Sequence, residues 1–404
     1  MRTLKARYVF PVCGEPILDG TVTIADGRIQ RVGPARRGDS LEDLGNVALL
    51  PGLVNAHTHL DLSGLNRPLG RPGNAMASWI REVIEYRRQR GGDAPAAIQR
   101  GLRESADYGV TTLGDIVQPG GMPQTAADAP DITWFLELIA PTAERVAPAL
   151  ELARRHLEQA ESLAPWRLGL SPHAPYTVHP DLLAALVSLS AHDRIPLAFH
   201  LAESPDEMQL LQSADGPLRE LLEQLGAWSP QLVQPGTRPL DYLRKLADAN
   251  RTLVIHGNYL DEEEIAWLGK YADRMAVVYC PRTHARFGHR RYPLEALLAA
   301  GANVALGTDS RATSPDLSLL ADLRHVARTY PGIGRDVVLE LGTLRAAKAL
   351  GRDADRGSLE PGKRADLVAI ALPDGDGADP YALWLESEGP VIAAWFAGVY
   401  CSPR

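Results

Sequence analysis

Four apolar segments of this 404-residue chain each end in a histidine or an aspartate. Residues 50–56 (LPGLVNA) lead into His57 and His59, and the later segments, residues 195–200, 252–256 and 304–309, end in His200, His256 and Asp309. Short apolar runs of this kind, broken by Gly, Ser or Pro, are typical of parallel strands whose carboxyl ends meet at one rim of a barrel. The pattern therefore predicts that these five polar side chains lie close together.

His57 and His59 lie two residues apart at the end of a predicted strand. Alternate residues of a strand point to the same face, so both imidazoles can converge on one point. Two such histidines beside a turn are more often satisfied by hydrogen bonds than by a metal ion. The three further segments that end in histidine or aspartate make a shared metal ion the better interpretation.

Short apolar runs alternate with amphipathic stretches between residues 51 and 357, and residues 76–84 (MASWIREVI) show the spacing of a helix. Eight strands are expected, beginning near residues 48, 111, 132, 167, 195, 252, 276 and 303. Residues 1–50 and 358–404 instead show the short β-like stretches of one discontinuous domain. We therefore predict an α/β fold in which a (β/α)8 TIM barrel over residues 51–357 carries a small β-sandwich domain built from both chain ends.

The charge balance favours a small-molecule partner. Lys and Arg total 42 against 50 Asp and Glu, a formal net charge of -8, and no basic stripe points to nucleic acid or a membrane surface. Three scattered cysteines, Cys13, Cys280 and Cys401, argue for a reducing compartment. The first residues lack the apolar core of a signal peptide, so we expect a cytoplasmic protein, with a homodimer as the commonest assembly.

Two serine–proline pairs predict helix starts close to the candidate residues. Ser204 and Ser314 each offer an N-cap, with proline next and an acid in the first turn. Asp309 could itself cap the following helix, but Ser314 is expected to serve that purpose.

Short motifs are spread along almost the whole chain. They are residues 51–59 (PGLVNAHTH), 171–178 (SPHAPYTV), 200–203 (HLAE), 256–257 (HG), 280–281 (CP), 307–309 (GTD) and 357–367 (GSLEPGKRADL). Together they resemble the amidohydrolase superfamily, and within it the cytosine deaminase and chlorohydrolase-like branch of metal-dependent deaminases. The resemblance implies a TIM-barrel hydrolase that acts on carbon–nitrogen bonds other than peptide bonds.

The resemblance also implies roles for single residues. The implied metal ligands are His57, His59, His200 and Asp309. The implied catalytic residues are Glu203, which shuttles protons, His256, which steers the attacking water, and Asp309. Such a ligand set leaves a divalent ion with an open position for water, whose pKa it lowers towards ~7. The plain alternatives are a solvated residue before a helix for Glu203 and a buried, hydrogen-bonded histidine for His256.

One metal ion is expected. Binuclear members of this superfamily commonly bridge two metals with a modified lysine on the fourth strand, and residues 167–173 (RLGLSPH) contain no lysine. His and Asp ligands suit both zinc and iron, and zinc is preferred.

The predicted substrate pocket departs from the family pattern, because residues 280–289 read CPRTHARFGH where many relatives carry Cys-Pro-x-Ser-Asn. Polar residues on predicted rim loops are candidates for holding a heterocycle, ribose hydroxyls or a carboxylate, with loop solvation as the plain alternative. These candidates are His173, Arg282, His284, Arg286 and Arg311.

Residues 57–63 (HTHLDLS), residues 77–84 and Arg87 also resemble aminodeoxyfutalosine deaminases, which remove the 6-amino group of an adenine-bearing nucleoside. This adds Trp79 to the candidate substrate contacts, although Trp79 also fits the apolar face of the first barrel helix. We therefore predict hydrolytic deamination of a 6-aminopurine nucleoside such as aminodeoxyfutalosine, adenosine or S-adenosylhomocysteine, with release of ammonia. One of the arginines at 282, 286 and 311 would hold a distal carboxylate.

Other activities use the same ligands. They are chlorotriazine hydrolysis, guanine or pterin deamination, and cyclic-amide hydrolysis like that of an imidazolonepropionase. A non-catalytic metal-bound scaffold of this fold is the remaining class, and it would be expected to have lost a ligand or Glu203. Neither is missing from the sequence.

Overall fold

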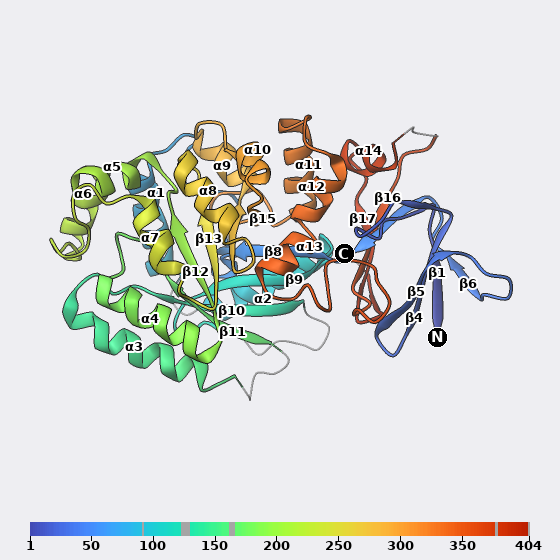
Figure 1. The fold of residues 1–404 in the computed structure, drawn as a ribbon, viewed down its shortest axis with the longest axis horizontal. Helices are drawn as coiled ribbons and strands as arrows, with labels where there is room; N and C mark the ends of the chain where they lie inside the picture. Colours follow the sequence, from blue (N-terminus) through green and yellow to red (C-terminus); the bar gives the residue numbers. More distant parts are fainter. Residues whose placement is uncertain (91–92, 123–129, 161–165, 376–378, 403–404) are drawn as a thin grey trace.

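The computed structural model describes residues 1–90, 93–122, 130–160, 166–375 and 379–402. Its largest part is a barrel of eight parallel strands that pair in chain order (Figure 1), and a parallel bridge between Thr58 and Asp309 brings the last strand back to the first. The predicted TIM-like barrel is confirmed. Its strands are β8 (Leu53–Thr58), β9 (Val110–Val117), β10 (Asp131–Leu138), β11 (Arg167–Pro172), β12 (Pro196–Leu201), β13 (Arg251–His256), β14 (Met275–Tyr279) and β15 (Asn303–Leu306).

Seven of these strands begin within one residue of the predicted position, but the first does not. The apolar run that contains His57 forms two strands, β7 (Val47–Pro51) and β8, which belong to different sheets. Gly52 lies between them, where a Cβ atom would collide with the side chain of Thr111. Because both strands are buried throughout, apolar character alone does not show where the chain passes from one sheet to the next.

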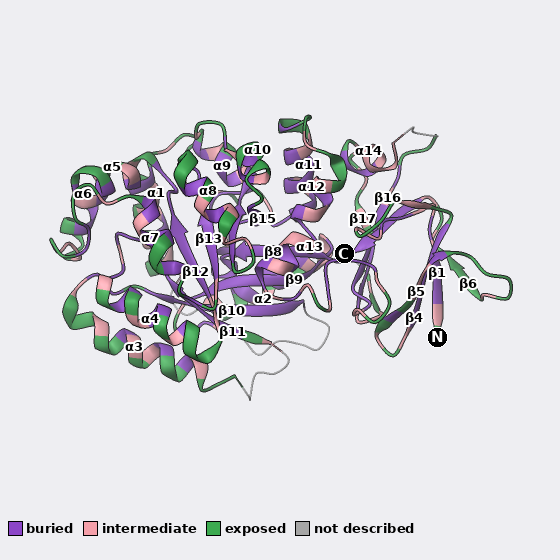
Figure 2. Ribbon diagram, viewed as in Figure 1, coloured by how far each residue is buried: buried purple, intermediate pink, exposed green. Residues whose placement is uncertain are grey.

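Helices cover the outside of the barrel and turn their apolar sides toward its buried strands (Figure 2). The helices are α1 (Met76–Gln89), α2 (Ala94–Asp107), α3 (Ala143–Leu157), α4 (Pro180–Asp193), α5 (Pro205–Ser213), α6 (Pro217–Gln224), α7 (Pro239–Leu246), α8 (Glu262–Lys270), α9 (Pro281–Phe287), α10 (Leu294–Ala299), α11 (Leu319–Thr329), α12 (Arg335–Leu341), α13 (Leu344–Ala349) and α14 (Pro380–Leu385), with a 3-10 turn η1 (Leu60–Leu62). In the described ranges, no helix combines the length and apolar character needed to cross a membrane.

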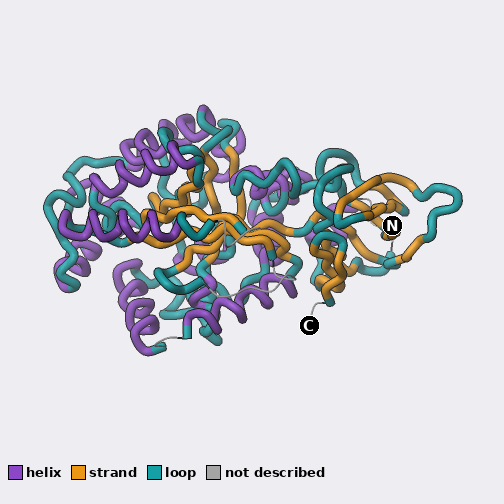
Figure 3. Tube along the Cα trace, turned by 90° about the horizontal axis from the view of Figure 1, so that it is seen from below, coloured by secondary structure: helices purple, strands orange, loops and turns teal. Residues whose placement is uncertain are grey.

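Both chain ends build one small β unit beside the barrel (Figure 3). A four-stranded sheet has the order β5-β4-β1-β6, and a six-stranded sheet has the order β18-β17-β16-β7-β2-β3. Leu4, Ile24, Leu367 and Trp395 contribute to one apolar core that the two sheets share, as in a sandwich. The strands not yet given are β1 (Arg2–Lys5), β2 (Tyr8–Val9), β3 (Ile17–Leu18), β4 (Gly20–Ala25), β5 (Arg28–Pro34), β6 (Leu41–Asp43), β16 (Leu367–Ala371), β17 (Val391–Phe396) and β18 (Val399–Cys401).

The union of the two chain ends in small sheets is as predicted. The domain boundaries at residues 50/51 and 357/358 stay a prediction, and β7 continues one residue past the first of them.

All barrel strands run in the same direction, so their carboxyl ends share one rim. Helix α5 begins at this rim as predicted, and the hydroxyl of its N-cap Ser204 accepts a hydrogen bond from the Glu207 amide. The prediction for Ser314 is wrong, because no helix begins there. Helix α11 begins at Leu319, and Ser318 caps it by accepting a hydrogen bond from the Ala321 amide. Ser-Pro also occurs in turns, so the dipeptide alone does not locate a helix start.

Candidate metal centre and active site

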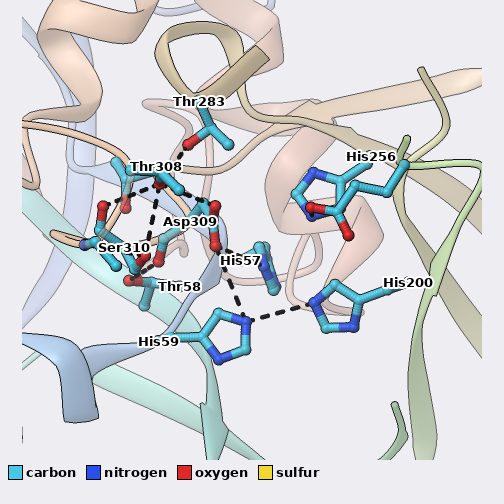
Figure 4. Close-up of polar contacts among 12 residues, drawn as sticks. His57, Thr58, His59, His200, His256, Thr283, Thr308, Asp309 and Ser310 are labelled. Atoms are coloured by element: carbon cyan, nitrogen blue, oxygen red, sulfur yellow. Dashed lines mark hydrogen bonds and ion pairs between the residues drawn. The ribbon is translucent and has the colours of Figure 1, made fainter. Parts of the chain in front are cut away.

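Four side chains meet at the rim of the barrel. His57 Nε2 lies 3.6 Å and His59 Nε2 3.9 Å from Asp309 Oδ1. His59 Nε2 lies 3.4 Å from His200 Nε2, and Figure 4 shows the three rings gathered beside the aspartate. The structure thus brings together the four residues that the sequence predicts as metal ligands, although they come from three strands separated by about 250 positions of chain.

Buried ring nitrogens without partners indicate what this set is suited to bind. In the described part of the chain, neither ring nitrogen of His57 has a hydrogen-bond partner, and Nδ1 of His59 has none. Buried polar atoms in native proteins are nearly always paired. Imidazole nitrogens and a carboxylate oxygen are the ligand types that zinc takes in open sites, so a divalent ion fits this set and would satisfy the orphaned atoms.

The protonation of the set also suits a metal. Burial lowers the pKa of His59 and of His200 well below the ordinary value, so both rings are neutral near pH 7. His200 Nδ1 lies 3.0 Å from the carbonyl oxygen of His173, which leaves Nε2 to face the centre. Burial opposes the charge on Asp309, but the nearby rings of His57 and His256 and a hydrogen bond donated by Thr313 Oγ1 keep its pKa below the usual range.

Three non-glycine residues at this rim have left-handed backbone conformations. Ala202 has φ 54°, His256 φ 70° and Asp309 φ 57°. Each costs an L-residue roughly 1–2 kcal/mol, so the surrounding contacts have to hold it. These residues follow or end β12, β13 and β15, where the candidate side chains leave the barrel.

Asn55 is one such contact, and it is not among the site residues predicted from the sequence. Its buried side chain donates to Thr308 Oγ1 at 2.8 Å and accepts from the amides of His57 and Thr308, both at 3.2 Å. It therefore ties the end of β8 to the residue before Asp309. The available signal was a lone amide within an apolar strand.

Glu203 and His256 form a pair beside the four candidate ligands. Glu203 Oε1 lies 3.2 Å from His256 Nε2. Burial, with the charges of Asp309 and Glu207, raises the pKa of Glu203 well above its usual range, whereas burial lowers the pKa of His256. A carboxyl group with a raised pKa can hold a proton near neutral pH and release it to a nearby base. His57, His200 and His256 also have ligand atoms within 4.8 Å of one another.

Glu207 holds the backbone of Glu203. Its buried carboxylate accepts hydrogen bonds from the Ala202 amide at 2.9 Å and the Glu203 amide at 2.7 Å. Asn258 donates to the carbonyl oxygen of Glu203 at 2.8 Å. The sequence marks Glu207 only as an acid in the first turn of a helix, but the structure uses it to fix the turn that carries Glu203.

A cavity of about 280 Å³ opens from these residues. His173 and Trp79, two of the predicted substrate contacts, line it. Arg87 and Glu137 also line it, with Arg87 Nη1 3.8 Å from Glu137 Oε2 and Glu137 Oε1 4.0 Å from His173 Nε2. Glu137 was missed by the sequence analysis, and its only signal is a charged residue inside the apolar strand β10.

Four other predicted substrate contacts do not line this cavity. Arg282 forms ion pairs with Asp316 at 2.7 Å and Asp322 at 3.1 Å. Arg311 pairs with Glu104 at 2.6 Å. Their charges are already neutralised by carboxylates from other elements, which the rim position of these arginines does not reveal.

The other two also have structural contacts. Arg286 donates to the carbonyl oxygens of Leu69 and Gly70, both at 2.7 Å. His284 is buried, with its ring 5.6 Å from that of Tyr279 and 5.3 Å from that of His289. This geometry gives no support to substrate contact by Arg282, His284, Arg286 or Arg311.

Comparison with known proteins finds relatives over most of the chain. A 5-methylthioadenosine/S-adenosylhomocysteine deaminase of Moorella thermoacetica is 28% identical over 390 residues, which is 91% of this chain and 85% of that protein. An aminodeoxyfutalosine deaminase of Deinococcus radiodurans is 29% identical over 323 residues, 77% of this chain and 75% of that protein.

Among solved structures, an adenosine deaminase from Xanthomonas campestris with bound zinc has a TM-score of 0.74 at 23% identity, over 98% of this chain and 92% of that one. At this identity the likeness supports the fold. The model of the amidohydrolase family matches residues 48–399, a range that contains every candidate ligand and the Glu203–His256 pair. The chain therefore belongs to the amidohydrolase family.

Proposed function

We propose that this protein is a metal-dependent hydrolytic deaminase that replaces the 6-amino group of an adenine nucleoside with oxygen and releases ammonia. The observation that carries the proposal is the buried Glu203–His256 pair, 3.2 Å apart, beside four side chains suited to a divalent ion and next to a cavity of about 280 Å³. Relatives named as deaminases of 5-methylthioadenosine, S-adenosylhomocysteine and aminodeoxyfutalosine support the same substrate class.

We assign one divalent ion to His57, His59, His200 and Asp309, with zinc first and iron second. Strand β11 contains no lysine that could bridge a second ion. When bound, such an ion polarises water and lowers its pKa toward neutrality. The structure with zinc noted above supports this choice of metal.

The residues of the chain move the protons. Glu203 accepts a proton from the water that adds to C6 of the purine, and delivers it to the adjacent ring nitrogen. Glu203 next takes the proton of the new hydroxyl group on C6 and passes it to the amino group, the C6–N bond breaks, and ammonia and the 6-oxo purine are the products. His256 lies within hydrogen-bond distance of Glu203 and is assigned the orientation of the water.

His173 is assigned to the purine ring. It lines the cavity, its ring lies 5.0 Å from that of His200, and its Nδ1 is held by Thr177 Oγ1 at 2.8 Å. The Thr177 contact occupies Nδ1, so Nε2, which lies 4.0 Å from Glu137 Oε1, is the ring nitrogen assigned to the substrate. Burial lowers the pKa of His173, so its ring is neutral at pH 7 and can donate or accept a single hydrogen bond.

Zinc-loaded protein tested for ammonia release decides between the substrate classes. We expect a 6-oxo product from adenine nucleosides, with kcat/KM well above that for guanine, a pterin, a chlorotriazine or a cyclic amide. A kcat/KM for one of these other compounds that exceeds every adenine nucleoside by orders of magnitude contradicts the proposal.

A further inference from the structure

A second cavity lies at the opposite end of the barrel from the candidate active site. It has a volume of about 580 Å³ and opens beside the amino ends of β11, β12 and β13, where Arg167, Pro196 and Arg251 line it. We call it the lower cavity. Reactions in TIM barrels take place at the carboxyl ends of the strands, so the deamination proposed above does not account for the lower cavity.

Three arginines line the lower cavity, and none of them is neutralised by a carboxylate. Arg167, Arg194 and Arg251 come from the start of β11, the end of α4 and the start of β13. Within the described ranges, none of the three forms an ion pair. The acidic residue among the described lining residues is Asp193, whose Oδ1 lies 2.6 Å from His192 Nδ1. The wall of the cavity therefore carries an excess of positive charge.

Structural contacts use only part of two of these guanidinium groups. Arg167 Nη1 donates to the carbonyl oxygen of Gly351 at 2.9 Å, and Arg251 Nη1 donates to that of Lys348 at 2.7 Å. A guanidinium group has five N–H donors, so each of these two arginines retains donors for a ligand. The two bonds also hold the arginines in place before a ligand arrives, which lowers the entropy that binding costs.

Arg194 has the least structural reason to be an arginine. It ends α4 with φ 57° and ψ 38°, a left-handed conformation that favours glycine. Its side chain has no hydrogen-bond or ion-pair partner in the described part of the chain. A positive charge suits the carboxyl end of a helix, but the helix dipole does not explain two further arginines from other elements at the same cavity. A shared anion explains all three.

The rest of the wall is apolar. Leu157, Ile195 and Leu350 contribute aliphatic side chains, and the half-buried Trp166 contributes an indole ring. Flat rings stack well on aromatic side chains of this kind. The volume of about 580 Å³ lies in the range of small-molecule sites, about 300 to 1,000 Å³, and leaves room for more than a phosphate ion.

We propose that the lower cavity binds a small organic phosphate of the nucleoside diphosphate class, with two adjacent phosphate groups at Arg167, Arg194 and Arg251 and its ring against Trp166. Arginine pairs with phosphate through charge-assisted hydrogen bonds, and a diphosphate has enough oxygens to engage three guanidinium groups. The inference goes beyond the proposed deamination and does not rest on it, because the two cavities lie at opposite ends of the barrel strands.

Calorimetric titration of the zinc-loaded protein with UDP, UMP and uridine tests the chemistry of the ligand. None of these compounds is a 6-aminopurine, so the proposed activity does not consume them. We expect UDP to bind once per chain, UMP to bind at least roughly tenfold more weakly, and uridine not to bind detectably. The Kd for UDP should rise with ionic strength. Absence of UDP binding, or equal affinity for UDP and either of the other compounds, overturns the inference.

Substitutions locate the bound UDP. Arg194→Gly should raise the Kd for UDP at least roughly tenfold and keep the fold, because glycine is favoured in the left-handed conformation. Arg194→Lys, which keeps the charge, should lose less affinity, and Arg251→Gln should also raise the Kd. Arg37→Gln, at an exposed arginine between β5 and β6, is the control and should leave the Kd unchanged. Circular dichroism checks the fold of each variant. An unchanged Kd in Arg194→Gly and Arg251→Gln places UDP elsewhere, for example at the metal centre, and overturns the inference.

Tryptophan fluorescence tests the position of the ring. Saturating UDP should change the emission of the wild type, and this change should be lost in Trp166→Phe. Trp228→Phe, at a half-buried tryptophan that does not line the lower cavity, should keep it. An emission change that survives in Trp166→Phe overturns the assignment of the ring to Trp166.

Discussion

The two ends of the cavity beside Glu203 and His256 are held in different ways. At the catalytic end the side chains leave the ends of strands, and buried polar groups bind the backbone on either side of them, as Asn55 does for His57 and Glu207 does for Glu203. At the other end, here called the apolar arm, the cavity is lined by aliphatic side chains of two helices, Ile80 and Ile84 of α1 and Leu218, Leu221 and Leu222 of α6. Trp79 and Arg87 of α1 line the cavity as well. Hydrogen bonds to the backbone fix the direction in which a side chain points, whereas contacts between aliphatic side chains mainly fix the volume that the cavity leaves open.

This difference indicates that reaction and selectivity are separable in this protein. Residues at the catalytic end are constrained by more than one partner, and three of them have strained backbone conformations. Residues of the apolar arm can change in size without moving a strand end. We therefore expect substitutions at the catalytic end to change kcat or metal content, and substitutions in the apolar arm to change KM and substrate preference.

The double substitution His57→Ala/His59→Ala should have the largest effect. It removes two of the four proposed ligands, so we expect loss of the bound metal and a fall in kcat/KM of at least roughly 10⁴-fold. Elemental analysis should give about one ion per chain before the change and none after it. His192→Ala, at an exposed histidine in the last turn of α4, is the control and should keep the metal. Two tightly held ions per wild-type chain would contradict the proposed centre.

Glu203→Gln should separate proton transfer from metal binding. The amide keeps the shape of the side chain but cannot take up the proton, so we expect kcat to fall by about 10²- to 10⁴-fold with the metal content unchanged. Rapid-quench or steady-state measurement of ammonia release gives kcat. Near-normal turnover in a metal-loaded variant would assign the proton transfer to another residue.

The same contrast explains which parts of the site the sequence predicts. His57, His200 and Asp309 each lie at or just after the end of an apolar run, and this alone predicts that they lie close together. The reason is that the parallel strands of a barrel end at one rim. The switch from β7 to β8 was not predictable in this way, because both strands are apolar and buried.

The substrate end depends on contacts between elements that are distant in sequence. Arg311 is expected to face the substrate from its rim position, but Glu104, on α2, neutralises it. Nothing local in residues 217–224 shows that three leucines of α6 line a cavity, because the same helical spacing is typical of any buried helix face. Glu137 and Asn55 did carry a signal, since each is a polar residue within an apolar strand.

Glu207→Gln should have a smaller effect on turnover than Glu203→Gln, because Glu207 acts through the backbone of Glu203. A glutamine side chain has only one oxygen to accept from two amides, and its NH2 group would face the second donor. We expect kcat to fall roughly 10- to 100-fold, with little change in metal content. A positioning role also predicts that Glu207→Asp, which keeps both oxygens, retains more activity than Glu207→Gln.

Glu207 should also change how the free energy of unfolding depends on pH. Burial raises its pKa from 4.5 to about 7, so the folded protein binds this proton more tightly than the unfolded chain. The contribution of Glu207 to the free energy of unfolding is therefore fully present below about pH 4.5 and falls as the pH rises to about 7. The stability of the wild type minus that of Glu207→Gln should fall over this range by up to ~3 kcal/mol. A difference that rises with pH would show that the carboxylate is stabilised in the folded state.

The smallest effect we predict concerns the serine that begins α5 beside Glu203. Ser204→Ala removes the hydroxyl that accepts from the Glu207 amide at 3.2 Å, and loss of such an N-cap costs about 1 kcal/mol of stability. Ser314→Ala is a matched control, because this second serine before a proline is buried but begins no helix, and its hydroxyl has no hydrogen-bond partner in the described ranges. Removal of the Ser314 hydroxyl should leave stability unchanged or slightly higher, because a buried hydroxyl without a hydrogen-bond partner does not stabilise the fold.

Thermal unfolding of both variants, loaded with the same metal, measures the difference. Equal losses in the two variants would mean that the hydroxyl of Ser204 does not hold the turn that carries Glu203, and that the carboxylate of Glu207 holds it alone.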